Sequence, residues 1–413
     1  MEPVVTINHE DEYELLFTLE GVDLSISNAI RRTILSSIKT PVFRTIPHDE
    51  NNCTIYKNTT RLNNEIIKQR LSCIPIHYLH RVSDELLDDL IMEVNVENNS
   101  SEYRMVTTRD FTIKSRTTGK LLSEEETKKV FPPSKIVFET TGKDAYIDFV
   151  KLRPKVSDVP GEHIHLTCTF TYENASRDGM FNVVSTCSYG LTKDETRIPA
   201  EYDKERQRLE GQGLSPEEVH FQLKNWLLLD SFRITKPNSV DFIIETLGVY
   251  SNKYIVHKAC EYLIKMLEEA DQYLELVQSP TQESHEFNLR INLGKIYGDY
   301  TIGKVIEKLL FKKYFEEEHI LEFCGFRKAH PHDEYATITL VYTEDFGMQH
   351  TQLMEAIRRG ETVTINDYHE VVISHINDSI DEAIRILNKI MVYFTSSKEA
   401  EEGSIPLSQL DFR

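Results

Sequence analysis

Two pairs of histidines have a spacing that could serve metal chemistry. His163 and His165 are separated by one residue, and so are His330 and His332. In a β-strand this spacing places both imidazoles on the same face, and imidazole is a common ligand of transition metals. The pairs therefore raise the hypothesis of a metal-dependent hydrolase.

The residues that would complete such a site are missing or have a simpler explanation. Acidic runs at 124–126 and 316–318 could provide acid–base or Mg²⁺ chemistry, but runs of this kind usually face solvent. The six cysteines are scattered without a C-x-x-C pair, so we expect buried thiols in a reducing compartment, no metal and no cofactor. The chain has no nucleophile motif, P-loop or dinucleotide fingerprint. A metal-dependent hydrolase is thus the alternative to a non-catalytic role.

The composition indicates a folded protein that does not bind nucleic acid by itself. The chain has 413 residues, 40% of them apolar, which is enough for two or three domains. Its net charge of −20 disfavours direct contact with phosphates, so work on DNA would go through partners. No apolar run approaches the roughly 20 residues of a membrane span, and the first residues lack the features of a signal peptide. We expect an intracellular protein with no membrane partner.

The most informative stretch is an apolar helix that contains Asn28, Arg31 and Arg32. The alternating run Tyr13–Leu19 predicts a strand before it, and the helix is expected to stop at Pro41. The two arginines lie at the edge of the apolar face or beyond it. They could be a solvated surface, or they could bind a partner, since the guanidinium group suits bidentate contacts. The apolar face recurs at four-residue spacing and contains Ile26, Ile30, Ile34 and Ile38.

A second strand and helix of the same kind open the last third of the chain. A strand is expected at Phe287–Leu293 and a helix from Thr301 to about Lys312. Each copy then closes with a strand and a long helix, at 241–267 and at 337–394. We predict an internal pseudo-dimer, because packing helix against helix across a pseudo-two-fold axis would bury both apolar faces. The alignment of the two helices pairs Ile26 with Ile302, Ile30 with Ile306 and Ile34 with Leu310.

The sequence pattern between the first helix and residue 157 indicates a β-rich insert. Short alternating runs predict strands at Leu90–Val96, Lys135–Glu139 and Ala145–Leu152, with one short helix at Asn63–Leu71. After it, strands are expected at Gly161–Thr171 and Val183–Tyr189, and a helix start at Ser215.

The predicted fold class is α+β, with two related dimerisation modules. The expected division is a discontinuous first module at 1–40 plus 158–277, a β-rich insert domain at 41–157, a linker at 278–286, a second module at 287–395 and a C-terminal tail at 396–413.

Several motifs, taken in order, resemble a known family. The earlier ones are similar to the alpha-type assembly proteins of cellular RNA polymerases, which are bacterial alpha, the archaeal D protein and the third-largest component of eukaryotic polymerase II. The later ones are similar to their small partner, the archaeal L protein and its eukaryotic counterpart. The first group is Asn28–Arg32, Leu62–Ile76 and Phe242–Gly248, and the second is Tyr300–Lys304, Cys324–His332 and Ser379–Phe394.

The resemblance implies a non-catalytic platform in which both proteins are fused, as in polymerases of some large cytoplasmic DNA viruses. It implies contacts with the largest and second-largest polymerase subunits and with small zinc-binding subunits, and with DNA only through the complex. The chain would lie in the host cytoplasm or virion if viral, and otherwise in the nucleus. The implied subunit-interface residues are Asn28, Arg31, Arg32, Arg70, Gly303, Phe326, Arg327 and His330.

Some positions depart from the family pattern. Eukaryotic relatives hold zinc with clustered cysteines in the insert, where this chain has only Cys53 and Cys73, so no zinc is predicted. Tyr300 and Lys304 stand where the family has His and Asn, which puts the detail of that turn in doubt. For Gly303, close packing of the backbone is preferred over phosphate binding.

Overall fold

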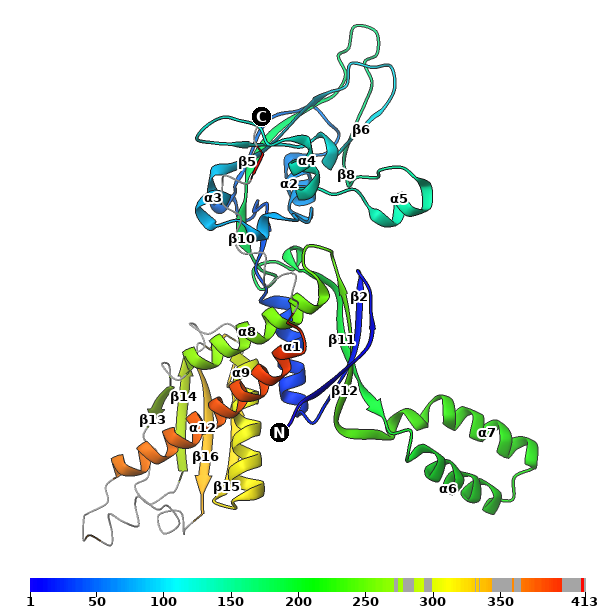
Figure 1. Cartoon of the computed structure of the whole chain (residues 1–413), viewed down its shortest axis with the longest axis vertical. Coiled ribbons are helices and arrows are strands. Elements are labelled where there is room, and N and C mark those ends of the chain that lie inside the picture. The colour runs from blue at the N-terminus through cyan, green and yellow to red at the C-terminus, as the bar shows by residue number, and fades with distance from the viewer. Residues whose placement is uncertain are drawn as a thin grey trace. The chain divides into compact units, whose positions relative to one another are not determined.

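The computed structural model describes residues 1–270, 274–277, 286–292, 299–330, 332–333, 335–343, 359, 365–395 and 410–411, and its elements are labelled in Figure 1. The chain divides into two compact units. Unit 1 is Met1–Thr33, Thr186–Glu245 and Val256–Phe394, and unit 2 is Ile34–Ser185, Thr246–Ile255 and Thr395–Arg413. Both mix helices and strands, which confirms the α+β class. No helix in the described residues is long and apolar enough to cross a bilayer.

The first sheet of unit 1 is four-stranded, in the order β1-β2-β12-β11, with antiparallel pairing of β1 to β2 and of β2 to β12. Alternation in β2 buries Leu15, Phe17 and Leu19, and Phe17 stacks on Phe242 of β12 with ring centroids 4.8 Å apart. The predicted strand before the arginine helix is thus confirmed. The strands are β1 (Val4–Glu10), β2 (Glu14–Glu20), β11 (Val184–Lys193) and β12 (Thr235–Thr246).

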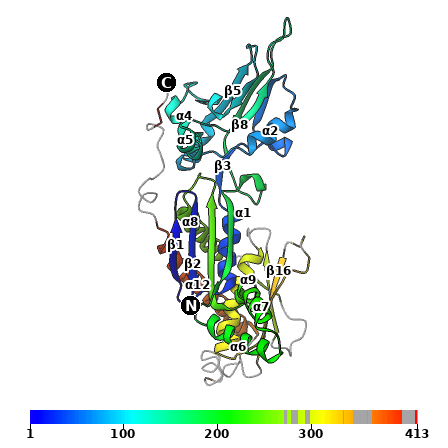
Figure 2. The same ribbon diagram turned by 90° about the vertical axis from the view of Figure 1, so that its right-hand side faces the viewer.

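Two helices accompany this sheet, α1 (Leu24–Ser36) after β2 and α8 (Asn252–Ala270) after β12. Asp23 begins α1, since its Oδ1 accepts a hydrogen bond of 2.8 Å from the N–H of Ser25. In Figures 1 and 2, α1 runs along one face of the sheet. The helix ends at Ser36, so its expected end at Pro41 is wrong. The chain has already turned extended there, because β3 (Thr40–Val42) pairs with β10 (Thr171–Glu173).

The second sheet of unit 1 repeats this plan, in the order β13-β14-β16-β15, and all neighbouring strands are antiparallel. A helix follows β14 and another follows β16, and the strands predicted at 287–293 and 337–342 are confirmed. The elements are β13 (Leu274–Val277), β14 (Glu286–Asn292), α9 (Asp299–Leu310), a π-helix (Phe311–Glu317), β15 (Leu321–Arg327), β16 (Tyr335–Tyr342) and α12 (Ile365–Val392).

A partly buried polar cluster fixes α12 on this second sheet. Tyr342 Oη and His375 Nδ1 lie 2.9 Å apart, and the His375 ring stacks on Tyr314 with centroids 4.1 Å apart. Tyr314 Oη and Lys313 Nζ each donate to Asp378 Oδ2 at 2.8 Å. Burial, followed by the Asp378 carboxylate, raises the pKa of Tyr314. Because each buried group has a partner, the cluster specifies one position of the helix.

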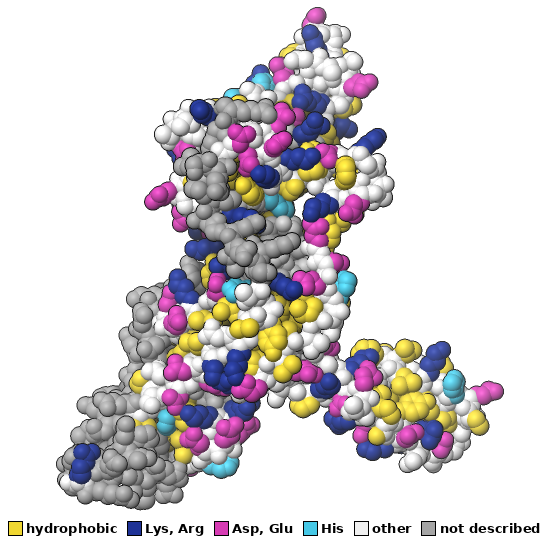
Figure 3. Space-filling view, viewed as in Figure 1, with side chains coloured by type: hydrophobic (Ala, Val, Ile, Leu, Met, Phe, Trp, Pro, Cys, Tyr) yellow, Lys and Arg dark blue, Asp and Glu magenta, His cyan; other side chains and the backbone are white. Residues whose placement is uncertain are grey.

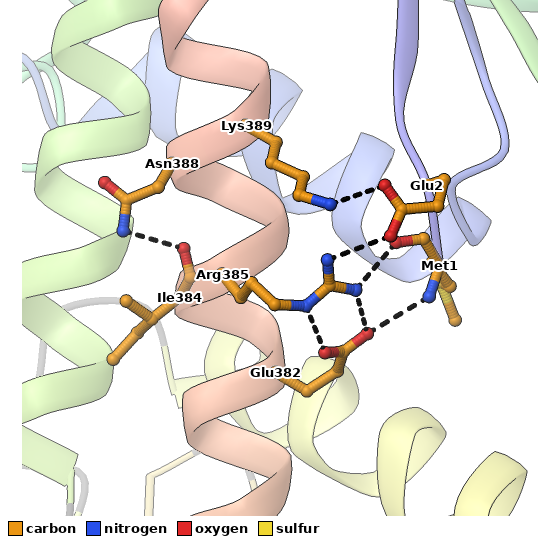
Figure 4. Close-up of polar contacts among 7 residues, drawn as sticks. All are labelled: Met1, Glu2, Glu382, Ile384, Arg385, Asn388 and Lys389. Atoms are coloured by element: carbon orange, nitrogen blue, oxygen red, sulfur yellow. Dashed lines mark hydrogen bonds and ion pairs between the residues drawn. The ribbon is translucent and has the colours of Figure 1, made fainter.

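The same helix holds the beginning of the chain, as Figure 4 shows. Glu382 accepts from the amino group of Met1 at 3.1 Å and from Arg385 Nε at 2.6 Å. Arg385 and Lys389 both pair with Glu2. An edge contact between Phe17 and Phe394 places the end of α12 against the first sheet.

A helical hairpin separates β11 from β12 within unit 1. It consists of α6 (Ile198–Gly211) and α7 (Pro216–Leu228). The predicted helix start at Ser215 is confirmed by a capping box, in which Ser215 and Glu218 bond reciprocally. A small core of Leu209, Val219 and Leu223 joins the two helices.

Unit 2 contains a four-stranded sheet in the order β4-β9-β5-β7, a ladder of β6 with β8, and the β3–β10 pair. Strands expected at 90–96, 145–152 and 161–171 are confirmed as β5, β8 and β9, and the helix expected at 63–71 as α2. The elements are β4 (Cys53–Asn58), α2 (Asn64–Ser72), α3 (Asp84–Asp89), β5 (Leu90–Glu97), β6 (Arg104–Thr107), β7 (Thr112–Ser115), α4 (Glu124–Val130), α5 (Lys135–Thr141), β8 (Asp148–Leu152) and β9 (His163–Thr169).

The strand expected at Lys135–Glu139 is wrong, because these residues lie in α5. Ser134 Oγ accepts from the N–H of Val137 at the start of the helix, and Gly142 ends it with a φ of 67°. These caps satisfy helix-end groups, and none of the residues of α5 is buried. Unit 2 therefore has more helices than the single one expected.

Two segments from the sequence prediction fall wholly or mostly beyond the described residues. Residues 278–285 of the expected linker are outside them, as are 396–409 and 412–413 of the tail. Leu410 is buried in the core of unit 2, and the carbonyl of Asp411 accepts from the N–H of Ser123 at 2.9 Å.

Candidate functional site

The apolar face of α1 is buried throughout. Ile26, Ile30 and Ile34 are each 1% exposed, as the four-residue spacing predicts for an inward-facing stripe. Ile38 is buried as well, but it lies beyond the end of the helix. The stripe therefore contributes packing, and only the margin of the helix is available for polar contacts.

Arg31 is held by its own helix. Its Nε and Nη2 donate to Oδ1 of Asn28, one turn earlier, at 3.0 and 2.9 Å. The guanidinium group is half-buried. Asn28 therefore orients Arg31 and restricts its rotamers, which lowers the entropy that a later contact would lose.

Arg32 is exposed and points toward α9, 269 residues later in the chain. Its Nε donates to Thr301 Oγ1 at 2.9 Å. A cavity of about 210 Å³ is lined by Asp23 and Ser25 at the start of α1 and by Lys304 and Phe311 from α9 and the π-helix that follows it. The two helices that the sequence alignment pairs thus lie beside one another within unit 1.

The equivalent face of α9 is also buried, with Ile302 2% exposed and both Ile306 and Leu310 fully enclosed. Gly303 packs directly on the ring of Phe326 in β15, so closely that a Cβ atom would overlap the ring. Phe326 is itself only 8% exposed. Both residues are therefore inside unit 1, and the preference for close packing at Gly303 agrees with this geometry.

Arg327 and His330 remain at the surface where β15 ends. The His330 N–H donates to Asp333 Oδ2 at 2.8 Å, and its Nδ1 accepts from the N–H of His332 at 3.2 Å. These bonds make a tight turn that presents the His330 ring to solvent.

Arg70 lies in unit 2, on α2. Its Nε donates to the carbonyl of Phe149 at 2.6 Å and its Nη2 to that of Asp148 at 2.8 Å. Both of these hydrogen bonds of Arg70 are therefore made with backbone carbonyls of β8. Arg70 fastens α2 to the β6–β8 ladder.

The histidine pairs do not form a metal centre. His163 and His165 share one face of β9, as predicted, with their rings 6.4 Å apart. Their Nε2 atoms contact Asn95 Oδ1 at 2.7 Å and Glu93 Oε1 at 2.9 Å. Across the described residues, no cluster of three or more His, Cys, Asp and Glu side chains could hold an ion. The hydrolase alternative has no support.

Four of the six cysteines are buried thiols, as expected: Cys53, Cys168, Cys187 and Cys260. Burial raises the pKa of Cys187 and of Cys260 to about 12, which keeps both protonated at neutral pH. The expectation is wrong for Cys73, which is exposed at the end of α2, and Cys324 is only partly buried.

Sequence reasoning did not find the contacts that lie between distant segments. Asn28 and Arg31 are three residues apart on one helix, so their bond could have been anticipated from spacing. The ion pairs of Glu2 with Arg385 and Lys389 join opposite ends of the chain, and no local pattern indicates them.

Comparisons with known proteins agree on one family. Residues 16–267, more than half of the chain, match the family model described as the RNA polymerase Rpb3/Rpb11 dimerisation domain. The human DNA-directed RNA polymerases I and III subunit RPAC1 is 36% identical over 73 residues, which cover 18% of this chain and 19% of that protein. DNA-directed RNA polymerase subunit Rpo3 of Methanosphaera stadtmanae is 27% identical over 191 residues, which cover 45% of this chain and 60% of that protein.

A conjugation stage-specific protein of Tetrahymena thermophila is 34% identical over 73 residues, covering 18% of this chain and 21% of that protein. The chain spans less than two thirds of the length of each of these three relatives. The matched range includes all of α1 and β12, on which two of the quoted motifs lie wholly or mostly, and most of α8. The chain belongs to the RNA polymerase Rpb3/Rpb11 dimerisation domain family.

Proposed function

We propose that this chain is a non-catalytic assembly subunit of a DNA-directed RNA polymerase, in which two dimerisation modules are fused into one internal pseudo-dimer. The observation that carries the proposal is the repeated plan of unit 1. The first sheet has the order β1-β2-β12-β11 and the second the order β13-β14-β16-β15, so each strand has a counterpart at the same position. In both, a helix follows the second strand and a longer helix closes the repeat.

The contacts between the repeats support the same proposal. Arg32 on α1 bonds to Thr301 on α9, and these are the helices related by the repeat. Ile26 and Ile30 face the interior, as do their counterparts Ile302 and Ile306. Seam helices of a dimer are expected to be buried in this way.

The repeat also suggests where the insert begins and ends. Chain between α1 and β11 has no counterpart between α9 and β15 beyond the π-helix. Because β9 lies between β4 and β5 in the sheet of unit 2, we propose that the insert expected at 41–157 extends at least to the end of β9. The rest of the proposed division is unchanged: a first module that begins with 1–40 and resumes after the insert to 277, a linker at 278–286, a second module at 287–395 and a tail at 396–413. Fusion raises the local concentration of each module for the other to roughly millimolar, which favours pairing without new contacts.

The surface residues divide into two docking positions. Arg31 and Arg32, oriented by Asn28 and Thr301, would bind the second-largest polymerase subunit. Arg327, exposed at the end of β15, and His330, exposed after it, would bind the largest. Gly303 and Phe326 act from inside the module by holding β15 against α9. Small zinc-binding subunits would join the complex, and DNA would be reached only through it. The chain would lie in the host cytoplasm or virion if its source is viral, and otherwise in the nucleus.

Co-purification with the large subunits tests the proposal. The tagged full chain, co-expressed with the two large polymerase subunits of the same genome, is expected to retain both. The Arg31→Ala/Arg32→Ala variant should lose the second-largest subunit and keep the largest, whereas Arg327→Ala/His330→Ala should do the reverse. Lys143→Ala, at an exposed position in unit 2, is the control and should change neither. Recovery of the wild-type chain without either subunit, or polymerase activity of the chain alone, would refute the assembly role.

A further inference from the structure

Unit 2 contains a cavity of about 450 Å³ between α2, β6 and β8. We call it the basic pocket, because its lining includes four cationic side chains and one carboxylate, that of Asp148. The cations are Arg61, Arg70, Lys151 and Arg153. In a chain with a net charge of −20 this local excess of positive charge stands out. Figure 3 shows Lys and Arg side chains gathered in the part of unit 2 that holds β6 and β8.

The four cations differ in whether their charged groups already have partners within the protein. The Nε and Nη2 atoms of Arg70 already donate hydrogen bonds to carbonyls of β8, and Arg153 forms an ion pair with Glu162. Arg61 and Lys151 are exposed, and within the described part of the chain neither has an ion pair. Arg61 and Lys151 are therefore the groups that can pair with an incoming anion, while Arg70 shapes the wall.

The pocket is also partly apolar. Tyr103 is 60% exposed and Met105 43% exposed, and Phe149 forms a fully buried floor. Lys151 Nζ lies 4.4 Å from the centroid of the Tyr103 ring, so its charge is held beside this apolar surface. Exposed apolar side chains next to cations suit a ligand that carries both carboxylates and an apolar side chain.

We propose that the basic pocket binds an acidic peptide segment of another polymerase subunit. An apolar side chain of that segment enters between Tyr103 and Met105, and flanking carboxylates pair with Arg61 and Lys151. The partner's identity as a polymerase subunit rests on the proposed assembly function, whereas the chemistry of the peptide rests on the pocket alone.

A peptide fits better than a nucleic acid for two physical reasons. The positive charge is confined to one cavity, whereas proteins that bind nucleic acid extend it along the phosphate backbone. The second reason is the exposed apolar surface of Tyr103 and Met105 beside the cations, which a phosphate backbone would leave uncovered. Recognition of a carboxylate–apolar pattern satisfies both the cations and the exposed Tyr103 and Met105.

Fluorescence anisotropy of the full chain tests the pocket directly. The probe is a short labelled peptide of aspartate and glutamate around a central phenylalanine, and a second peptide replaces that phenylalanine with serine. We expect the first to bind more tightly than the second, and the Arg61→Glu/Lys151→Glu variant to weaken its binding by about tenfold or more. Lys120→Glu/Lys143→Glu changes the net charge equally at exposed sites outside the pocket and should leave binding unchanged.

Two further measurements, RNA binding and co-purification, distinguish a peptide site from the alternatives. A single-stranded RNA of equal charge should show no difference between wild type and the pocket variant, and pocket-dependent RNA binding would overturn the proposal. In the co-purification assay, loss of a polymerase subunit from the pocket variant but not from the control supports it. If wild type retains the subunits and the pocket variant retains them equally well, the inference fails while the assembly function stands. If wild type retains none, the assembly function fails, and the anisotropy result alone decides the pocket.

Discussion

Replacing Gly303 with alanine should destabilise the contact between α9 and β15. A Cβ at this position would come within 2.5 Å of three carbons of the Phe326 ring. The ring cannot move freely, because it is 8% exposed and packs edge-on against Tyr300 at 5.9 Å. Overpacking of this kind costs about 1–3 kcal/mol, and a clash this close belongs near the upper end. The greater helix propensity of alanine offsets about 1 kcal/mol of this cost.

The net expectation for Gly303→Ala is therefore a loss of about 2 kcal/mol in the local free energy of unfolding, or about thirtyfold in the opening equilibrium. Hydrogen exchange read by mass spectrometry over α9 and β15 measures this locally in the full chain, which avoids assuming two-state unfolding. Gly211→Ala is the matched control, because Gly211 is also helical but has nothing within 4 Å of its Cβ position. It should be neutral or stabilising.

A second variant distinguishes a clash from a general defect. Combining Gly303→Ala with Phe326→Ala removes the overlapping ring, so the added Cβ should then cost nothing. The two substitutions are expected to be non-additive by at least about 1 kcal/mol, since they share one contact. Additive effects, or protection in Gly303→Ala equal to wild type, would show that the ring and the helix do not pack as described.

Three other predictions concern separate parts of the molecule. Hydrogen bonding and charge from Arg385, with the Met1 amino group, lower the pKa of Glu382 to about 2. A carboxyl group whose pKa is lowered in the folded state stabilises the fold above its unfolded pKa. The urea concentration at the unfolding midpoint should therefore decrease as the pH is lowered from about 5 to 2, and Glu382→Gln should make this decrease smaller. In thiol labelling at about pH 8, Cys73 should react first and Cys187 and Cys260 should stay protected until unfolding; Cys73→Ser should abolish the fast phase. Ser134→Ala should raise hydrogen exchange in α5 by removing a cap worth about 1 kcal/mol, yet leave the urea midpoint unchanged because none of the residues of α5 is buried.

Periodicity was a sound guide wherever an element packs one face on a core. The stripe of Ile26, Ile30 and Ile34 predicts the buried side of α1, and alternation predicts β2 and β5. Burial enforces these periods, so the sequence must carry them. The strand expected at Lys135–Glu139 failed because α5 has no buried face, and its caps at Ser134 and Gly142 decide its structure.

The sequence by itself determined the α+β class, the arginine helix and the order of motifs that points to polymerase assembly. The fold class and the helix follow from local periodicity and residue type, and the motif order is informative through its resemblance to a known family. Only the tertiary structure decided that Arg32 reaches Thr301 and that Arg70 fastens β8. A guanidinium group takes whichever acceptor the fold brings within about 3 Å, and that acceptor is set by the packing of distant segments.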